Sequence, residues 1–263
     1  MVTLLKLGGS LITDKTQRET LREDVLARLA SEIAQALGAN PTMQLVIGHG
    51  SGSFGHYEAK EHGTMAGVRA DAGWRGFARV ATIAATLNYH VANALQDAGV
   101  SVMRVQPSAS AIATDGVITD MSMVGIERAL SHKILPLVYG DVAFDDVRGG
   151  TIVSTETVLT YITQKLPVER ILLLGEVDGV LDDQNAVIST ITPLTFDAIA
   201  SHLGGSGGVD VTGGMYTKVK DMLLLASNPP YPTVQILNGM VEGRLQSALS
   251  GADVIGTTIR RSD

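Results

Sequence analysis

Glycine-rich segments follow several apolar stretches of this chain, and their residue types suit the binding of anions. One such segment reads His-Gly-Ser-Gly-Ser-Phe-Gly-His at residues 49–56, and an earlier apolar stretch ends in Gly8-Gly9. Gly140 follows a further apolar run, and Gly214 stands at the start of a predicted helix. Glycine lets the backbone approach a ligand closely, and the N–H groups at a helix start attract negative charge. The pattern predicts a polyanion site, with ordinary turns as the alternative.

Cationic and titratable side chains accompany these segments. Lys6 stands in an otherwise apolar stretch, where burial of an unpaired ammonium would cost roughly several kcal/mol, so an anionic ligand or a carboxylate partner is expected. Lys15 lies just past the first glycine pair, and Lys218 lies one helical turn after Gly214. His56 ends the second segment and can donate a hydrogen bond to an anion. The alternatives are solvated lysines and a surface or helix-capping histidine.

Several well-known site patterns are absent from the sequence. No G-x-x-x-x-G-K-[ST] loop, His-Glu-x-x-His pair or protein-kinase catalytic loop occurs, and the chain has no cysteine. Residues 50–55 fit G-x-G-x-x-G, but the acidic residue that a dinucleotide site needs after the second strand is missing. Zinc binding through His49 and His56 is a weak alternative. No dedicated metal site is expected.

Composition limits the class of protein. The 263 residues are 45% hydrophobic and 18% charged, which permits a large core and excludes a disordered chain. The net charge of −7 argues against general attraction to nucleic acid, although it does not exclude an anionic ligand in a local pocket. No apolar segment is long enough for a membrane span, and no signal peptide is evident, so we expect a cytoplasmic protein with no membrane partner.

Predicted strands alternate with predicted helices along most of the chain. This order favours an α/β fold with an open, mostly parallel sheet that carries helices on both faces. We expect two lobes, 1–166 and 167–263, that share one continuous sheet and form one compact unit with a weak boundary near Pro167. The predicted strands are 2–7, 45–47, 101–105, 134–139, 142–144, 151–153, 171–174, 234–237 and 254–255, with a possible hairpin at Asp115-Gly116. The main predicted helices are 21–37 (ending at Gly38), 74–98, 155–166 and one that starts near Gly213.

Taken together, these motifs resemble the amino acid kinase superfamily and, within it, the isopentenyl phosphate kinase family. The segments that carry the resemblance are Leu5-Lys6-Leu7-Gly8-Gly9-Ser10, Asp14-Lys15, residues 49–56, Gly140-Asp141, Val177-Asp178-Gly179-Val180 and Asp210-Val211-Thr212-Gly213-Gly214-Met215 with Lys218. Two positions depart from the family's usual pattern. Ser51 stands where a third glycine is usual, and Leu174-Gly175-Glu176 stands where a Thr-Asp pair is frequent.

The resemblance implies an αβα sandwich, an ATP site in the second lobe and a phosphate-binding site in the first. It implies transfer of the γ-phosphoryl group of ATP, with Mg²⁺, to the small-molecule phosphate substrate isopentenyl phosphate, in line and without a general base. It also implies a homodimer. The implied catalytic residues are Lys6, Lys15, His56 and Lys218. The implied acceptor-binding residues are Ser51, Gly52, Gly55, His56 and Gly140. The implied ATP-binding residues are Lys6, Gly8, Gly9, Ser10, Gly52, Glu176, Asp178, Gly179, Val180, Gly214 and Lys218.

Two other functions stay open on sequence grounds. One is a kinase of the same fold that acts on a phosphonate, uridylate or amino-acid acceptor. The other is a nucleotide sensor without catalysis, which the presence of Lys6, Lys15 and Lys218 argues against.

Overall fold

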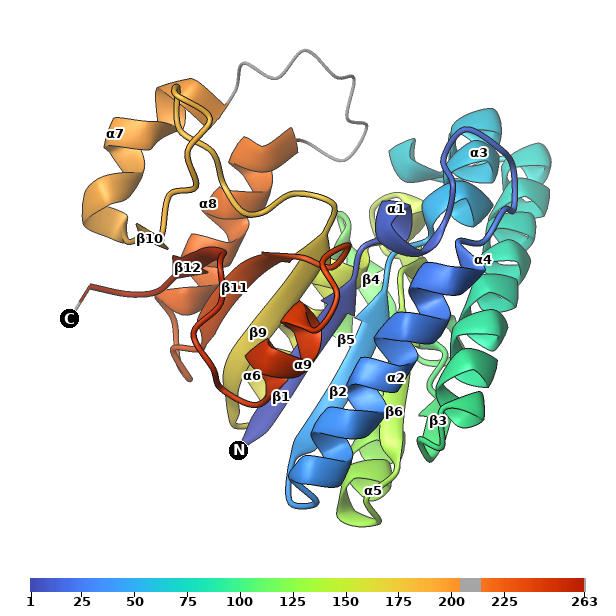
Figure 1. The fold of residues 1–263 in the computed structure, drawn as a ribbon. Helices are drawn as coiled ribbons and strands as arrows, with labels where there is room; N and C mark the ends of the chain where they lie inside the picture. Colours follow the sequence, from blue (N-terminus) through green and yellow to red (C-terminus); the bar gives the residue numbers. More distant parts are fainter. Residues whose placement is uncertain (204–213, 263) are drawn as a thin grey trace.

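An eight-stranded sheet runs through the whole molecule in the computed structural model, which describes residues 1–203 and 214–262. The strand order is β10-β12-β11-β9-β1-β2-β6-β3. Strands β11, β9, β1, β2, β6 and β3 are parallel neighbours, whereas β12 runs antiparallel to β11 (Figure 1). The strands of this sheet are β1 (Val2–Leu7), β2 (Gln44–His49), β3 (Val102–Arg104), β6 (Leu135–Tyr139), β9 (Val168–Gly175), β10 (Thr190–Ile191), β11 (Thr233–Asn238) and β12 (Thr257–Ile259).

Helices cover both faces of this sheet because its central strands are apolar on both sides. Leu4 and Leu5 are adjacent in β1 and fully buried, yet they belong to different core clusters. The cluster with Leu5 packs against α2 (Glu23–Ala39), α4 (Asp71–Asp97) and α9 (Arg244–Leu249). The cluster with Leu4 packs against α5 (Val124–Ser131), α6 (Thr155–Lys165) and α8 (Gly214–Ala226). The expected αβα sandwich is therefore confirmed.

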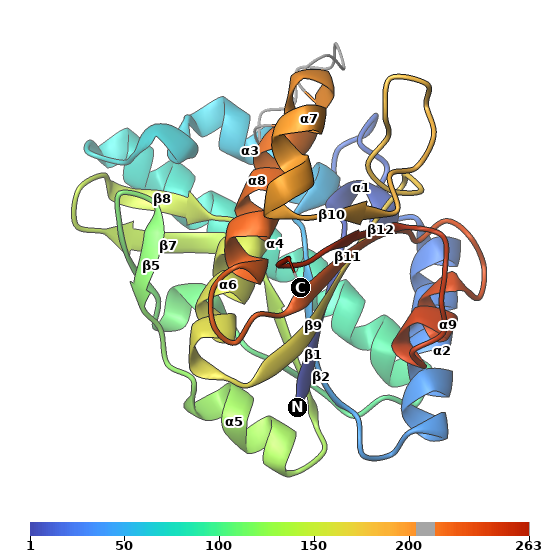
Figure 2. The ribbon, with the colours of Figure 1, turned by 90° about the vertical axis from the view of Figure 1, so that its left-hand side faces the viewer.

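A second, four-stranded sheet was not expected. Its order is β5-β4-β7-β8, formed by β4 (Ile112–Thr114), β5 (Val117–Asp120), β7 (Asp141–Asp145) and β8 (Gly149–Val153). The predicted hairpin at Asp115-Gly116 joins β4 to β5, and both turn residues have positive φ. In the view of Figure 2, β5, β7 and β8 lie on the opposite side of the molecule from α2 and α9.

The sequence misplaced some elements. Residues 254–255 are not a strand, and Ile255 is exposed; the closing strand is β12, two residues later. Gly38 does not end α2, which continues to Ala39 and is capped by the Asn40 backbone. The short helices α1 (Gly9–Ile12), α7 (Pro193–Leu203) and α9, and the 3-10 turns Thr64–Ala66 and Pro107–Ala109, were not predicted. In the described residues, no helix has the length and apolar character needed to cross a membrane.

Candidate active site

The carboxyl ends of four parallel strands meet at one rim of the large sheet. A glycine segment follows three of these strands, and the segments lie next to one another. The N–H group of the first glycine in each segment bonds to the neighbouring strand. Gly8 N–H donates to the Leu174 carbonyl at 2.8 Å, and Gly50 N–H donates to the Leu7 carbonyl at 3.0 Å. Gly140 N–H continues the series by donating to the last carbonyl of β2 at 3.2 Å. In Figure 1 the short helix α1 lies at this rim, at the opposite end of β1 from the N-terminus.

Lys6, Glu156 and Lys218 converge at this rim from distant parts of the sequence. The Lys6 ammonium pairs with the carboxylate of Glu156, the second residue of α6. Burial acts to raise the pKa of Glu156, but the nearby charges of Lys6 and Lys218 and the hydrogen bond from Lys6 outweigh it, so the net pKa is lowered. Of the two partners expected for Lys6, an anionic ligand or a carboxylate, the structure shows a carboxylate, and Lys218 lies near the same group.

The start of α6 is held at the end of β2. Thr155 Oγ1 donates to the His49 carbonyl at 2.6 Å, and the Ser154 side chain accepts from Thr157 N–H as a helix N-cap. This N-cap and the Thr155 hydrogen bond fix the position of Glu156. Gly140 lies close by, since a Cβ at that position would stand 3.2 Å from the Thr155 nitrogen.

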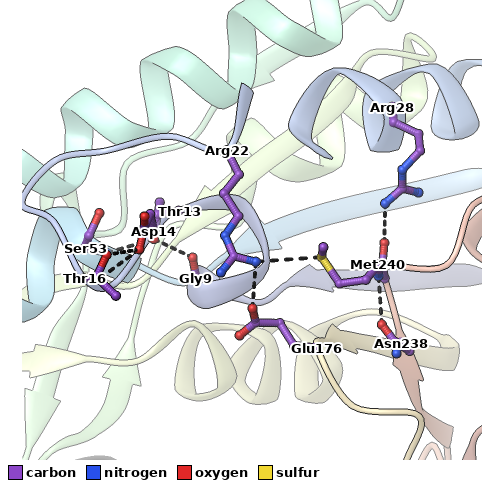
Figure 3. Close-up of polar contacts among 11 residues, drawn as sticks. Gly9, Thr13, Asp14, Thr16, Arg22, Arg28, Ser53, Glu176, Asn238 and Met240 are labelled. Carbon is purple, nitrogen blue, oxygen red and sulfur yellow. Dashed lines mark hydrogen bonds and ion pairs between the residues drawn. The ribbon is translucent and has the colours of Figure 1, made fainter. Parts of the chain in front are cut away.

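The first two glycine segments contact each other directly. A Cβ on Gly9 would overlap the backbone of Gly52, and a Cβ on Gly52 would overlap the Thr13 hydroxyl. Gly52 also has φ +49°, a conformation that L-residues with side chains rarely adopt. Thr13 Oγ1 donates to the Gly9 carbonyl at 2.7 Å and accepts from Ser53 N–H at 2.9 Å (Figure 3). Glycine is therefore required where the two segments touch.

Helix α3 (Gly52–His62) starts in the second glycine segment. Among its first N–H groups, Ser53 N–H donates to Thr13 Oγ1, and the Phe54 and Gly55 N–H groups donate to the Ser51 carbonyl. The positive end of the helix dipole still favours an anion there. Ser51 caps the helix with φ −76°, so the serine that replaces the family's usual glycine causes no strain. Gly55 lies against the Ser51 side chain, and His56 follows as a partly buried residue of the same helix.

A buried histidine lies beneath the second segment. His49 is 1% exposed and its ring stacks on Tyr139 at 5.7 Å between centroids. Its Nδ1 donates to the Gly50 carbonyl at 3.1 Å, because a carbonyl can only accept, and its Nε2 therefore accepts from Asn88 Nδ2 at 3.0 Å. Burial lowers the pKa of His49 to about 4, and the hydrogen bond to Gly50 opposes this only in part. His49 is therefore neutral at physiological pH.

Lys15 lies in an exposed loop between α1 and α2. The Tyr57 hydroxyl of α3 donates to the Lys15 carbonyl at 2.9 Å. Arg18 lies over the Tyr57 ring at 5.4 Å and pairs with Glu61 at 2.7 Å and with the buried Glu58 at 3.7 Å. The loop that carries Lys15 is thus attached to the same helix as His56.

Charged pairs line the predicted nucleotide side of the rim. Glu176 accepts from Arg22 at 2.7 Å, and Arg22 also approaches the Met240 sulfur at 3.8 Å (Figure 3). Asp178 accepts from Arg244 and Asn238, and hydrogen bonds from these two groups lower the pKa of its carboxyl.

Two predicted nucleotide residues are packed into the protein. The Val180 side chain is buried, its N–H donates to Thr257 Oγ1 at 2.7 Å, and its carbonyl accepts from Ile188 N–H at 2.8 Å. Gly179 lies against the same threonine.

The amino acid kinase family profile matches residues 1–238. The chain belongs to the amino acid kinase family. An isopentenyl phosphate kinase from Methanocaldococcus jannaschii is 32% identical over 100% of both chains, and one from Methanothermobacter thermautotrophicus is 35% identical over 97% of this chain and 98% of that protein. A crystal structure of an isopentenyl phosphate kinase superposes with a TM-score of 0.82 at 31% identity, covering 98% of this chain and all of the other.

Family membership confirms the predicted fold and an ATP-dependent kinase. In this amino acid kinase the rim gathers Lys6, the first two glycine segments, Gly140 and Lys218. Gly214 begins α8 four residues before Lys218. Asp210, Val211, Thr212 and Gly213 lie outside the described residues.

Sequence reasoning missed Thr13 and Glu156. Thr13 lies between recognised motifs, but threonine carries no signal of a two-loop contact. Glu156 had one usable signal, its place in the first turn of a predicted helix next to a strand end, but its pairing with a lysine 150 residues away is set by the fold.

Proposed function

We propose that this chain transfers the γ-phosphoryl group of ATP to isopentenyl phosphate and forms isopentenyl diphosphate and ADP. The observation that carries the proposal is the meeting of Lys6 and Lys218 at Glu156, beside the glycine segments at one rim. The similarity to isopentenyl phosphate kinases over nearly the whole chain supports the choice of acceptor.

The chemistry requires relief from repulsion between two phosphates more than it requires a base. A phosphate monoester is already anionic near neutral pH, so its oxygen can attack without losing a proton to the protein. At an effective dielectric of about 20, a lysine about 4 Å from a phosphate oxygen contributes roughly 4 kcal/mol of attraction. Lys6, Lys15 and Lys218 would provide such charges as the phosphoryl group passes in line between its two oxygens.

Each set of rim groups has a role in this proposal. Gly9, Ser10, Gly52 and Gly214 would direct backbone amides, and Ser10 a hydroxyl, at the ATP phosphates. Gly8 would lie beside them, since its own amide already donates to the Leu174 carbonyl. The nucleotide would extend along residues 176–180 in the lobe 167–263. His56 would hold the acceptor phosphate with Ser51, Gly52, Gly55 and Gly140 in the lobe 1–166. Glu156 would keep Lys6 and Lys218 at the rim, since it pairs with the first and lies near the second.

Magnesium would come with ATP. Among the described residues no group of three or more histidine and carboxylate side chains is placed to hold a metal, and Glu156 is already engaged by lysine. The ATP phosphates and water would therefore supply most of the Mg²⁺ ligands. A homodimer remains a prediction from the resemblance, and a cytoplasmic location remains a prediction from the sequence.

A coupled assay of ADP release tests the acceptor. The purified chain is assayed with Mg-ATP and, in separate reactions, isopentenyl phosphate, dimethylallyl phosphate, glutamate and uridylate. We expect the highest kcat/KM with isopentenyl phosphate and at most background rates with glutamate and uridylate. A preference for either of these last two, or no ADP release with any acceptor, would refute the proposal.

A further inference from the structure

Thr13 connects the two glycine segments through one hydroxyl group. It is fully buried and caps α1, the short helix that follows the first segment. Its Oγ1 donates to the Gly9 carbonyl at 2.7 Å and accepts from the Ser53 N–H at 2.9 Å, so one atom bonds to both segments (Figure 3). Its donor and one of its two acceptor lone pairs are therefore used between these two loops.

Ser53 extends this connection to the loop that carries Lys15. Its hydroxyl accepts from Thr20 N–H at 3.2 Å and donates to the Thr20 carbonyl at 3.3 Å. Asp14 N–H in turn donates to the Thr20 carbonyl at 2.9 Å, which closes the loop next to Thr13. The position of Ser53 in α3 is therefore coupled to the loop of Lys15 and, through Thr13, to the loop of Gly9.

We infer that Thr13 is a positioning residue that fixes the donor-phosphate segment relative to the acceptor-phosphate segment. The inference rests on the proposed function, in which Gly8, Gly9 and Ser10 contact ATP and residues 51–56 contact the acceptor. Apart from Gly52, which the proposed function places at both phosphates, each segment binds its own phosphate, so loss of the link leaves binding of each substrate largely intact. The separation of the two phosphates changes instead, and a displacement of about 1 Å can cost about a hundredfold in rate.

Two pairs of variants that differ mainly by the hydroxyl test this role. Thr13→Val replaces the hydroxyl with a methyl group at nearly constant volume. Thr13→Ser and Thr13→Ala both lack the threonine methyl group and differ from each other by the hydroxyl alone. Thr163→Val is the matched control, because Thr163 is equally buried but its hydroxyl donates only to the Leu159 carbonyl within α6. The measurements are single-turnover transfer from Mg-ATP to isopentenyl phosphate, the KM of each substrate and the melting temperature.

The expected result is a selective loss of the transfer step. Single-turnover rates fall at least tenfold in Thr13→Val and in Thr13→Ala relative to Thr13→Ser, while each KM changes less than about threefold. Thr13→Ser and Thr163→Val stay within about threefold of wild type. Equal rates with and without the hydroxyl, or a loss confined to KM, would overturn the inference. So would failure of both hydroxyl-free variants to fold, because Thr13 would then be a structural residue.

Hydrogen exchange separates this inference from the proposed function. An inactive wild-type chain would refute the function, but exchange of residues 8–13 and 51–56 needs no substrate. We expect faster amide exchange in both segments of Thr13→Val than in wild type and Thr163→Val. Unchanged exchange in either segment would contradict the link between the loops.

Discussion

At the scale of single residues, some groups at the rim could be predicted from the sequence and others could not. Lys6 was recognisable because an ammonium in an apolar strand needs a partner, and its partner is Glu156. Glu156 lies in the first turn of α6 and also acts on Asp221, whose pKa is raised mainly by burial and further by this carboxylate. This carboxylate thus interacts with charges from two distant elements, β1 and α8.

The acceptor role of His56 gives the first prediction. His56→Ala should keep the fold and ATP affinity but lower kcat/KM for isopentenyl phosphate at least tenfold, because the acceptor phosphate loses a hydrogen-bond donor. Steady-state kinetics and ATP titration measure both effects. His132→Ala is the control, since His132 is exposed at the end of α5. Unchanged use of the acceptor in His56→Ala would remove this residue from the site.

The buried His49 gives a prediction about pH and stability. Its pKa is about 4 in the folded chain and about 6.5 when unfolded, so between these values the unfolded chain binds a proton that the folded chain does not. Stability should fall as the pH falls through this window, by about 2 kcal/mol between pH 7.5 and pH 5.

Urea denaturation at both pH values checks this for wild type and His49→Asn. Asparagine does not titrate and can still donate to the Gly50 carbonyl, so the variant should lose about 2 kcal/mol less than wild type. The same pH dependence in both proteins would show that His49 is not the group responsible.

At the scale of elements, the glycine segments were readable but their contact was not. The order strand, glycine, helix predicted which loops reach the rim, because parallel strands place their carboxyl ends together. That Gly9 touches Gly52 follows from the adjacency of β1 and β2, which a single sequence does not state. Gly38 misled in the opposite direction: it is an exposed glycine inside α2, and Asn40 ends that helix instead.

Gly52 and Gly38 form a matched pair for substitution. Gly52→Ala should destabilise the fold by about 2 kcal/mol or more, because φ +49° disfavours a side chain and a Cβ would stand 2.7 Å from the Gly9 carbonyl oxygen. Gly38→Ala should stabilise it by about 0.5–1 kcal/mol, since no atom lies within 4 Å of the added Cβ. Urea denaturation measures both. A neutral Gly52→Ala would contradict the tight contact of the two segments.

At the scale of the whole molecule, strand pairing and side-chain hydrogen bonds cross the predicted lobe boundary at Pro167. Strand β9, after the boundary, pairs with β1 along its length. Arg28 of α2 donates to the Gly239 carbonyl at 2.6 Å, and the buried Glu32 accepts from Gln246 N–H at 3.1 Å. The sheet edge was less predictable, because strands of two or three residues such as β10 and β12 carry too short a pattern.

This continuity predicts one cooperative unfolding transition. Trp74 is the single tryptophan and lies in the predicted lobe 1–166, so its fluorescence reports that part of the chain, whereas far-ultraviolet circular dichroism reports the whole chain. The two signals should give coincident urea midpoints. Two separated midpoints would show that the lobes unfold independently.

The central claim is that this rim binds two phosphates next to each other and transfers the γ-phosphoryl group of ATP to the other. Phosphorus-31 NMR of the purified chain with Mg-ATP and isopentenyl phosphate tests it most directly, since ADP release alone does not distinguish transfer from ATP hydrolysis. The account predicts loss of the monophosphate signal and growth of two mutually coupled signals of a diphosphate monoester, in step with ADP. Accumulation of inorganic phosphate with isopentenyl phosphate unchanged would contradict it.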